Sequence, residues 1–137
     1  MNPLVVLDNE AIQALASPHH PKHQSTVNHV QLLVRRKKRT TAITLVAPTA
    51  VRVEVGWDRA SPQWAFLNRL PIADAHLDEG SANKAAAIRE QAQVSVADAH
   101  IGATVQSAPH LDITVLTSDP KDIRKVVGGR PVKIIRI

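Results

Sequence analysis

The sequence of 137 residues contains no cysteine. This absence excludes disulfide bonds, thiolate metal sites and cysteine nucleophiles. It also fits a protein kept in a reducing compartment, and we expect a cytoplasmic location. The first residues lack the basic segment of a secretory signal peptide, so we expect no such peptide. No apolar run approaches the roughly 20 residues that a membrane-spanning helix needs.

Aromatic residues are also scarce, at 2% of the chain, and are limited to Trp57, Trp64 and Phe66. This argues against binding of single strands by base stacking, which needs rows of exposed aromatic side chains. We expect Trp64 and Phe66 to lie in the core or in an interface. Acidic residues are the minority charge, because 17 Lys and Arg face 12 Asp and Glu, for a net charge of +5. A basic surface favours a polyanionic partner such as nucleic acid, although Arg-rich proteins without such a partner also exist.

The length is that of one domain, which we expect to span residues 1–137. Apolar runs typical of buried strands alternate with helical patterns along the chain. The expected strands are residues 4–7, 42–46, 70–73, 113–116 and 132–137. We expect Pro48 to start a helix over residues 48–59, and Asp74 to cap the Ala-rich helix that ends near Gln93. The alternation predicts an α/β domain with a mostly parallel sheet between helices.

Acidic residues follow the predicted strands, where ligands bind in open α/β sheets. Asp8 follows the first strand and Asp119 the fourth. Glu54 lies within the helix after the second strand, next to apolar positions where a solvated glutamate is less expected. Asp98 lies in the first turn of a helix that Ser95 starts. These four acids are therefore candidates for a common site.

Clustered carboxylates repel one another unless a cation holds them together. Mg²⁺ and Mn²⁺ prefer such oxygen ligands, and these ions can activate water and stabilise the leaving oxygen of a phosphodiester. Helix capping is the alternative interpretation for Asp8, Asp98 and Asp119, whereas Glu54 is not explained by capping. The two interpretations are compatible, because a capping side chain can also point into a metal site.

Four segments carry a resemblance to a known family. Residues 7–11 (LDNEA), 47–54 (APTAVRVE), 95–101 (SVADAHI) and 115–122 (VLTSDPKD) resemble, in order and spacing, the PIN domain of VapC-type ribonuclease toxins from bacterial toxin–antitoxin pairs. The resemblance extends over almost the whole chain. It implies a three-layer α/β/α sandwich around a mostly parallel five-stranded sheet, cleavage of RNA with Mg²⁺ or Mn²⁺, a cognate antitoxin and a homodimer.

The resemblance also implies roles for individual residues. The catalytic and metal-binding acids would be Asp8, Glu54, Asp98 and Asp119. Asp122 would be a further acid of the metal site, and Thr117 matches a small hydroxyl residue that often precedes the last acid. Glu10 departs from the family, which often has Ser or Thr there. This extra carboxylate would either join the metal site or face solvent.

Two other groups of residues are weaker candidates. A basic run offers contacts to RNA phosphates, but it also suits a solvated helix end. It consists of Arg35, Arg36, Lys37, Lys38 and Arg39. The histidines His19, His20 and His23 lack a carboxylate pattern beside them, so we expect a surface loop rather than a metal site. We expect His100 to be a packing residue or a partner contact.

Two alternatives to the nuclease stay open at this point. A phosphohydrolase of the haloacid-dehalogenase type also has an acid after its first strand. It requires a second aspartate two residues on, where this chain has Glu10. The other alternative is a catalytically inactive PIN-like module that binds RNA or protein. The presence of all four acids argues against it.

Overall fold

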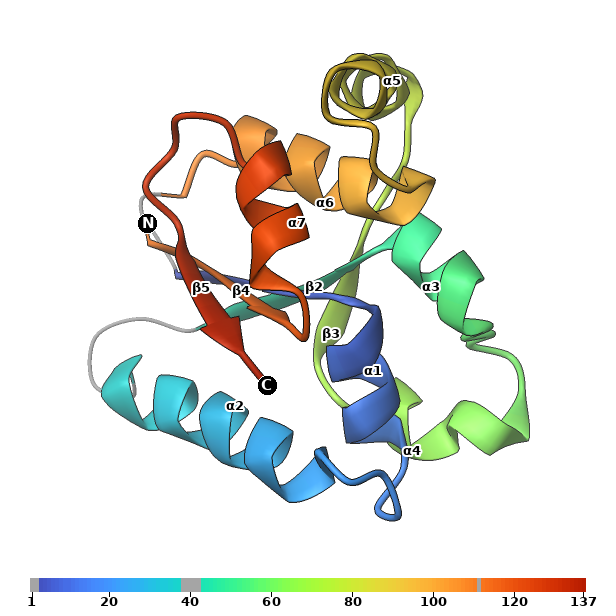
Figure 1. Ribbon diagram of the computed structural model, residues 1–137. Helices are drawn as coiled ribbons and strands as arrows, with labels where there is room; N and C mark the ends of the chain where they lie inside the picture. The colour runs from blue at the N-terminus through green and yellow to red at the C-terminus, as the bar shows by residue number, and fades with distance from the viewer. Residues whose placement is uncertain (1–2, 38–42, 111) are drawn as a thin grey trace.

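The computed structural model describes residues 3–37, 43–110 and 112–137, and these form one sheet between layers of helices (Figure 1). All pairings between neighbouring strands are parallel, and the strand order is β3-β2-β1-β4-β5. The strands are β1 (Leu4–Leu7), β2 (Thr44–Pro48), β3 (Ile72–Ala75), β4 (Ile113–Thr117) and β5 (Lys133–Arg136). The predicted parallel sheet is confirmed.

Helices cover both faces of the sheet (Figure 1). One face carries α1 (Asn9–Ala16) and α2 (His23–Lys37). The other carries α6 (Val96–Ser107) and α7 (Pro120–Val126), with α5 (Glu79–Ala92) packed on the outer side of α6. The short helix α3 (Thr49–Val55) contacts both α1 and α6, and η1 (Pro62–Trp64) and α4 (Ala65–Asn68) follow it. The three-layer α/β/α arrangement is thus confirmed.

The central strands β1 and β4 are buried along their whole length. Strands covered on both faces have continuous apolar sequences, which is why these runs could be recognised. From β1 the chain proceeds to β2 and β3 on one side of the sheet, and β4 and β5 lie on the other. Such a reversal of direction leaves a crevice at the carboxyl ends of the two central strands. Asp8 and Asp119 follow these two ends.

The helix predicted over residues 48–59 is wrong at both ends. Pro48 is the last residue of β2, where it is in register with Ala75, and it serves as the N-cap of α3. The helix ends at Val55 because Gly56 adopts a left-handed conformation, with φ of 77°. The chain then turns Trp57 into the core, where 3% of the residue is exposed.

The predicted capping role of Asp74 is also wrong. Asp74 lies in β3, and Arg52 and Arg59 each approach its carboxylate at 2.8 Å. Burial opposes ionisation of Asp74, but these two cations outweigh it and lower its pKa. The cap of α5 is instead Asp78, whose Oδ1 accepts a 2.9 Å hydrogen bond from the backbone N–H of Ser81.

No helix in the described part of the chain is long and apolar enough to cross a membrane.

Candidate active site

Asp8 is the most buried acid of the candidate site, with 7% of the residue exposed. Its carboxylate caps α1, because Oδ1 accepts a 2.6 Å hydrogen bond from the backbone N–H of Asn9. Oδ2 accepts a 2.5 Å hydrogen bond from the hydroxyl of Thr117, at the end of β4. The same hydroxyl accepts a 2.9 Å hydrogen bond from the backbone N–H of Asp119. One buried threonine therefore connects the acid after β1 to the acid after β4.

Asp119 and Asp122 lie at the start of α7. Asp119 is the N-cap, and its Oδ1 accepts a 3.3 Å hydrogen bond from the backbone N–H of Asp122. The carboxylate of Asp122 forms a 3.1 Å ion pair with Lys125, one turn further along the helix. The capping interpretation of Asp8 and Asp119 is thus correct, and it coexists with their position at the sheet crevice.

Glu54 extends from α3 and is exposed, although its neighbour Val51 is fully buried. The expectation that Glu54 shares an apolar face is therefore wrong. Its Oε1 accepts a hydrogen bond from the side-chain amide of Asn9, whose Oδ1 accepts one from the amide of Gln13. The sequence interpretation missed both amides. Their spacing of four residues puts them on one face of α1, which is the signal that could have revealed them.

Asp98 lies in the first turn of α6, where its backbone N–H donates a 3.1 Å hydrogen bond to the hydroxyl of Ser95. Burial, together with the charges of Asp8, Asp122 and Glu54, raises the pKa of Asp98 to about 6. Charge repulsion of this kind requires that the carboxylates be near one another. The structure therefore brings acids from α3, α6 and α7 to the crevice beside Asp8.

The pKa of Asp8 is also raised, mainly by burial and further by the charges of Glu54 and Asp119. The hydrogen bonds from Thr117 and Asn9 oppose this shift. All five acids predicted for the metal site thus take part in one region of mutual repulsion. No three Asp, Glu or His side chains among the described residues lie close enough to enclose an ion as they stand. The donor set is nevertheless one of hard carboxylate oxygens with unbalanced negative charge, which fits Mg²⁺ or Mn²⁺.

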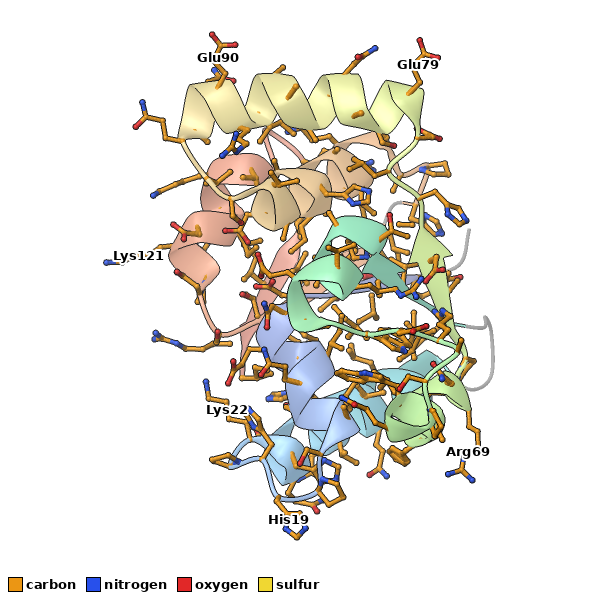
Figure 2. All side chains as sticks on the ribbon, turned by 90° about the vertical axis from the view of Figure 1, so that its right-hand side faces the viewer. His19, Lys22, Arg69, Glu79, Glu90 and Lys121 are labelled. Atoms are coloured by element: carbon orange, nitrogen blue, oxygen red, sulfur yellow. The ribbon has the colours of Figure 1, made fainter. Side chains whose placement is uncertain are left out.

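Other acids are directed elsewhere. The carboxylate of Glu10 faces His20, with 3.0 Å between Oε1 and Nε2, and Lys22 Nζ lies 4.0 Å away. Glu10 is therefore paired with residues of the loop before α2. It lies neither in the metal site nor in open solvent, the two positions expected from the sequence. Glu79 and Glu90 extend outward from α5, away from the rest of the molecule (Figure 2).

The histidines of the loop before α2 do not form a metal site. His19 points outward (Figure 2), His20 pairs with Glu10, and His23 Nδ1 lies 2.7 Å from the carbonyl oxygen of Ala14. The basic run is only partly visible. Arg35, Arg36 and Lys37 end α2, but their side chains lie outside the described residues, as do Lys38 and Arg39 altogether.

His100 is a packing residue, as expected, with 1% of the residue exposed. Its Nδ1 accepts a 3.2 Å hydrogen bond from the backbone N–H of Ala50. Burial lowers the pKa of its imidazole. Trp64 packs against Trp57, with 6.4 Å between ring centroids, whereas Phe66 remains 44% exposed.

Comparisons with known proteins agree with this architecture. No protein-family model matches the sequence, and no curated protein matches it significantly. Among solved structures, VapBC2 from Rickettsia felis, bound to a DNA fragment from their promoter, matches with a TM-score of 0.60 and 14% identity, over 96% of this chain and 98% of that chain. FitAB bound to an IR36 DNA fragment matches with a TM-score of 0.58 and 18% identity, over 96% and 94% of the two chains. The resemblance to the PIN domain of VapC-type toxins is thus confirmed at the level of the fold.

The raised pKa of Asp98 predicts a pH-dependent cost to stability. In the unfolded chain Asp98 loses its proton around its ordinary pKa of 3.8, whereas in the folded protein its pKa is about 6. The wild type therefore loses stability as pH rises through this interval. In metal-free buffer, we expect Asp98→Asn to raise the unfolding temperature by about 3 °C at pH 8, a value discounted for the partial exposure of Asp98. The gain should vanish at pH 3.5. Calorimetry at both pH values measures it, and an equal gain at both would contradict the charge repulsion.

The bond between Thr117 and Asp8 predicts a contrast between two substitutions. Thr117→Val keeps the shape of the side chain but removes the donor to Oδ2 of the buried Asp8 carboxylate, which keeps only the bond from the backbone N–H of Asn9. We therefore expect a loss of about 2 kcal/mol in the free energy of unfolding at pH 8. The loss should become smaller as pH falls, because the pKa of Asp8 is raised and a protonated carboxyl needs the bond less. Thr117→Ser keeps the hydroxyl and serves as the control. Urea titrations measure all three proteins, and a serine variant as unstable as the valine variant would argue against the bond.

Proposed function

We propose that this protein is a metal-dependent endoribonuclease that hydrolyses RNA phosphodiester bonds, and that it is the toxin of a toxin–antitoxin pair. The observation that supports this most strongly is that the Thr117 hydroxyl joins Asp8 and the backbone of Asp119 at the carboxyl ends of the two central strands. The raised pKa of Asp98, caused by burial and by neighbouring acids, agrees with it. Although the chain has a net charge of +5, five of its twelve acids belong to this region. A cluster of acids in a basic protein suits a bound cation that lies between the carboxylates and a negatively charged substrate.

Under this proposal Asp8, Glu54, Asp98 and Asp119 hold Mg²⁺ or Mn²⁺, and Asp122 lies at the rim of the site. When bound, the ion supplies a water of lowered pKa and neutralises charge on the leaving oxygen. The protein would prepare its ligands in different ways. Asp8 is held by two donors, and Glu54 is oriented by Asn9 and Gln13. Asp98 carries a proton below about pH 6 when no cation is present, so occupation of the site would release it.

The RNA backbone would bind to cations outside the acidic crevice. We propose the run Arg35, Arg36, Lys37, Lys38 and Arg39 for this role, as the sequence suggests. Lys22 and Lys121 extend outward on the same side of the molecule in Figure 2 and would add phosphate contacts. Neutralisation of phosphates by Lys and Arg makes affinity fall steeply with salt. Because the proposed substrate is RNA inside the cell, we propose that the protein acts in the cytoplasm.

The proposed partner is a cognate antitoxin. The two similar structures are VapBC2 and FitAB, each bound to DNA. The shared fold over 96% of this chain supports a similar pairing here. We also propose a homodimer, as the family resemblance implies.

A catalytically inactive PIN-like module that binds RNA or protein is the second candidate. The exposure of Glu54 and the absence, within the described residues, of three side chains that enclose an ion favour it. Glu54→Gln separates the two candidates. Loss of cleavage with retained RNA binding supports the enzyme, whereas a variant that behaves as the wild type supports the module. A haloacid-dehalogenase-type enzyme is disfavoured, because Glu10 faces His20 instead of the acidic crevice.

The proposed activity predicts a contrast between two acids that are two residues apart. Purified wild type should cut a labelled pool of total RNA with Mg²⁺ or Mn²⁺ but not with EDTA. Asp8→Asn should reduce the cleavage rate at least about 100-fold, because even the loss of a residue that only orients a metal ligand costs roughly 10- to 100-fold. Glu10→Gln, the matched control, should cut as the wild type does, because Glu10 lies outside the crevice. Cleavage that survives in EDTA or in Asp8→Asn would contradict the proposal.

A further inference from the structure

We propose that His100 is a positioning residue for the candidate active site: its Nδ1 anchors the start of α3 to α6 and thereby holds Glu54 beside Asp98. This inference rests on the proposed function, because it assigns Glu54 to the working site. His100 itself touches neither the acids nor a substrate. Its contribution would be to the geometry between two helices that each carry one acid.

The contact is a hydrogen bond across the helix interface. The backbone N–H of Ala50 donates to His100 Nδ1 at 3.2 Å. Ala50 is the second residue of α3, so its N–H is one of the first four that have no acceptor within the helix. An acceptor from α6 therefore satisfies a donor that α3 cannot satisfy by itself.

The residues at the start of α3 do not supply this acceptor. Pro48 is the N-cap and makes no side-chain capping bond. Thr49 has a hydroxyl in the right region, but its Oγ1 accepts a 3.0 Å hydrogen bond from the backbone N–H of Leu77. The short helix thus lacks the usual local cap, and His100 replaces it from another element.

Helix α6 offers a fixed anchor. The ring of His100 is almost fully buried, and Gly102, two residues on, approaches α7 so closely that an added Cβ would lie 2.5 Å from the carbonyl oxygen of Val126. Close-packed backbones of this kind leave little freedom to shift. A contact to His100 therefore fixes α3 relative to α7 as well as to α6.

The anchor and the acid lie about one helical turn apart along α3. His100 binds the backbone N–H of Ala50, and Glu54 follows four residues later, so a shift of the helix start would be carried to Glu54. Glu54 is exposed, and the side-chain hydrogen bond described for it comes from Asn9 on α1. With α1 on one side and His100 on the other, α3 is held at both contacts. Without His100, the helix start would shift and Glu54 with it.

A matched set of variants tests this role. Asparagine keeps a hydrogen-bond acceptor at the atom bonded to Cγ, where His100 has Nδ1, and leucine has the same branching without an acceptor. The proteins to compare are the wild type, His100→Asn and His100→Leu. The measurements are kcat and KM for RNA cleavage with Mn²⁺, hydrogen exchange of the Ala50 amide, and the NMR signal of the Asn9 side-chain amide that binds Glu54.

We expect His100→Leu to lower kcat about tenfold, because small misplacements of a site residue have effects of this order, while KM changes less than about twofold. The Ala50 amide should exchange about fivefold faster, as loss of one hydrogen bond implies. The Asn9 side-chain signal should shift, and His100→Asn should restore most of each property. A general loss of stability would instead lower the unfolding temperature while leaving kcat of the folded protein unchanged.

Three results would overturn the proposal. The first is a leucine variant with wild-type kcat although its Ala50 amide is unprotected. The second is an asparagine variant as defective as the leucine variant. The third is an unchanged Asn9 side-chain signal in His100→Leu. If the wild type cuts no RNA with either metal, the proposed function fails, and the NMR measurements still decide the role of His100. Should His100→Leu not fold, His100→Gln replaces it, because its amide lies one carbon further out.

Discussion

The hydroxyl of Thr117 makes the interaction on which the site depends. It donates to the buried carboxylate of Asp8 and accepts from the backbone of Asp119, so it joins the carboxyl ends of the two central strands. A buried carboxylate without donors is strongly disfavoured, and a charge-assisted hydrogen bond offsets much of that cost. The crevice at the reversal of the sheet can therefore keep an acid that the core would otherwise exclude.

Electrostatics explain why the remaining acids matter. Burial and mutual repulsion raise the pKa of both Asp8 and Asp98, whereas Asp74, which is paired with two arginines, has its pKa lowered. Two arginines thus neutralise Asp74, whereas repulsion persists at the crevice although Lys125 pairs with Asp122. Groups with strongly perturbed ionisation in a cleft are typical of functional sites. These repelling carboxylates lie in a chain that is basic as a whole, with a net charge of +5.

Much of this arrangement could be predicted from the sequence. The apolar runs of β1 and β4 are continuous because both faces are covered, and the ends of parallel strands gather at one edge. Asp8 and Asp119 therefore had predictable positions. Asp74 did not, because its partners Arg52 and Arg59 become neighbours only when β3 pairs with β2. The exposure of Glu54, its contact with Asn9 and the bond from Ala50 to His100 depend in the same way on how α3 lies between α1 and α6. Periodicity predicts such a helix but not its neighbours.

The central claim is that the repelling carboxylates form a site for a divalent cation. Its most direct test is the unfolding temperature at pH 8 during a titration with Mn²⁺, for the wild type and for Asp119→Asn. Binding to the folded state alone stabilises it by about 2.7 kcal/mol at 100 times the dissociation constant. We predict a saturable rise for the wild type and little or none for the variant. A wild-type unfolding temperature that does not respond to millimolar Mn²⁺, or an equal rise in both proteins, would contradict the claim.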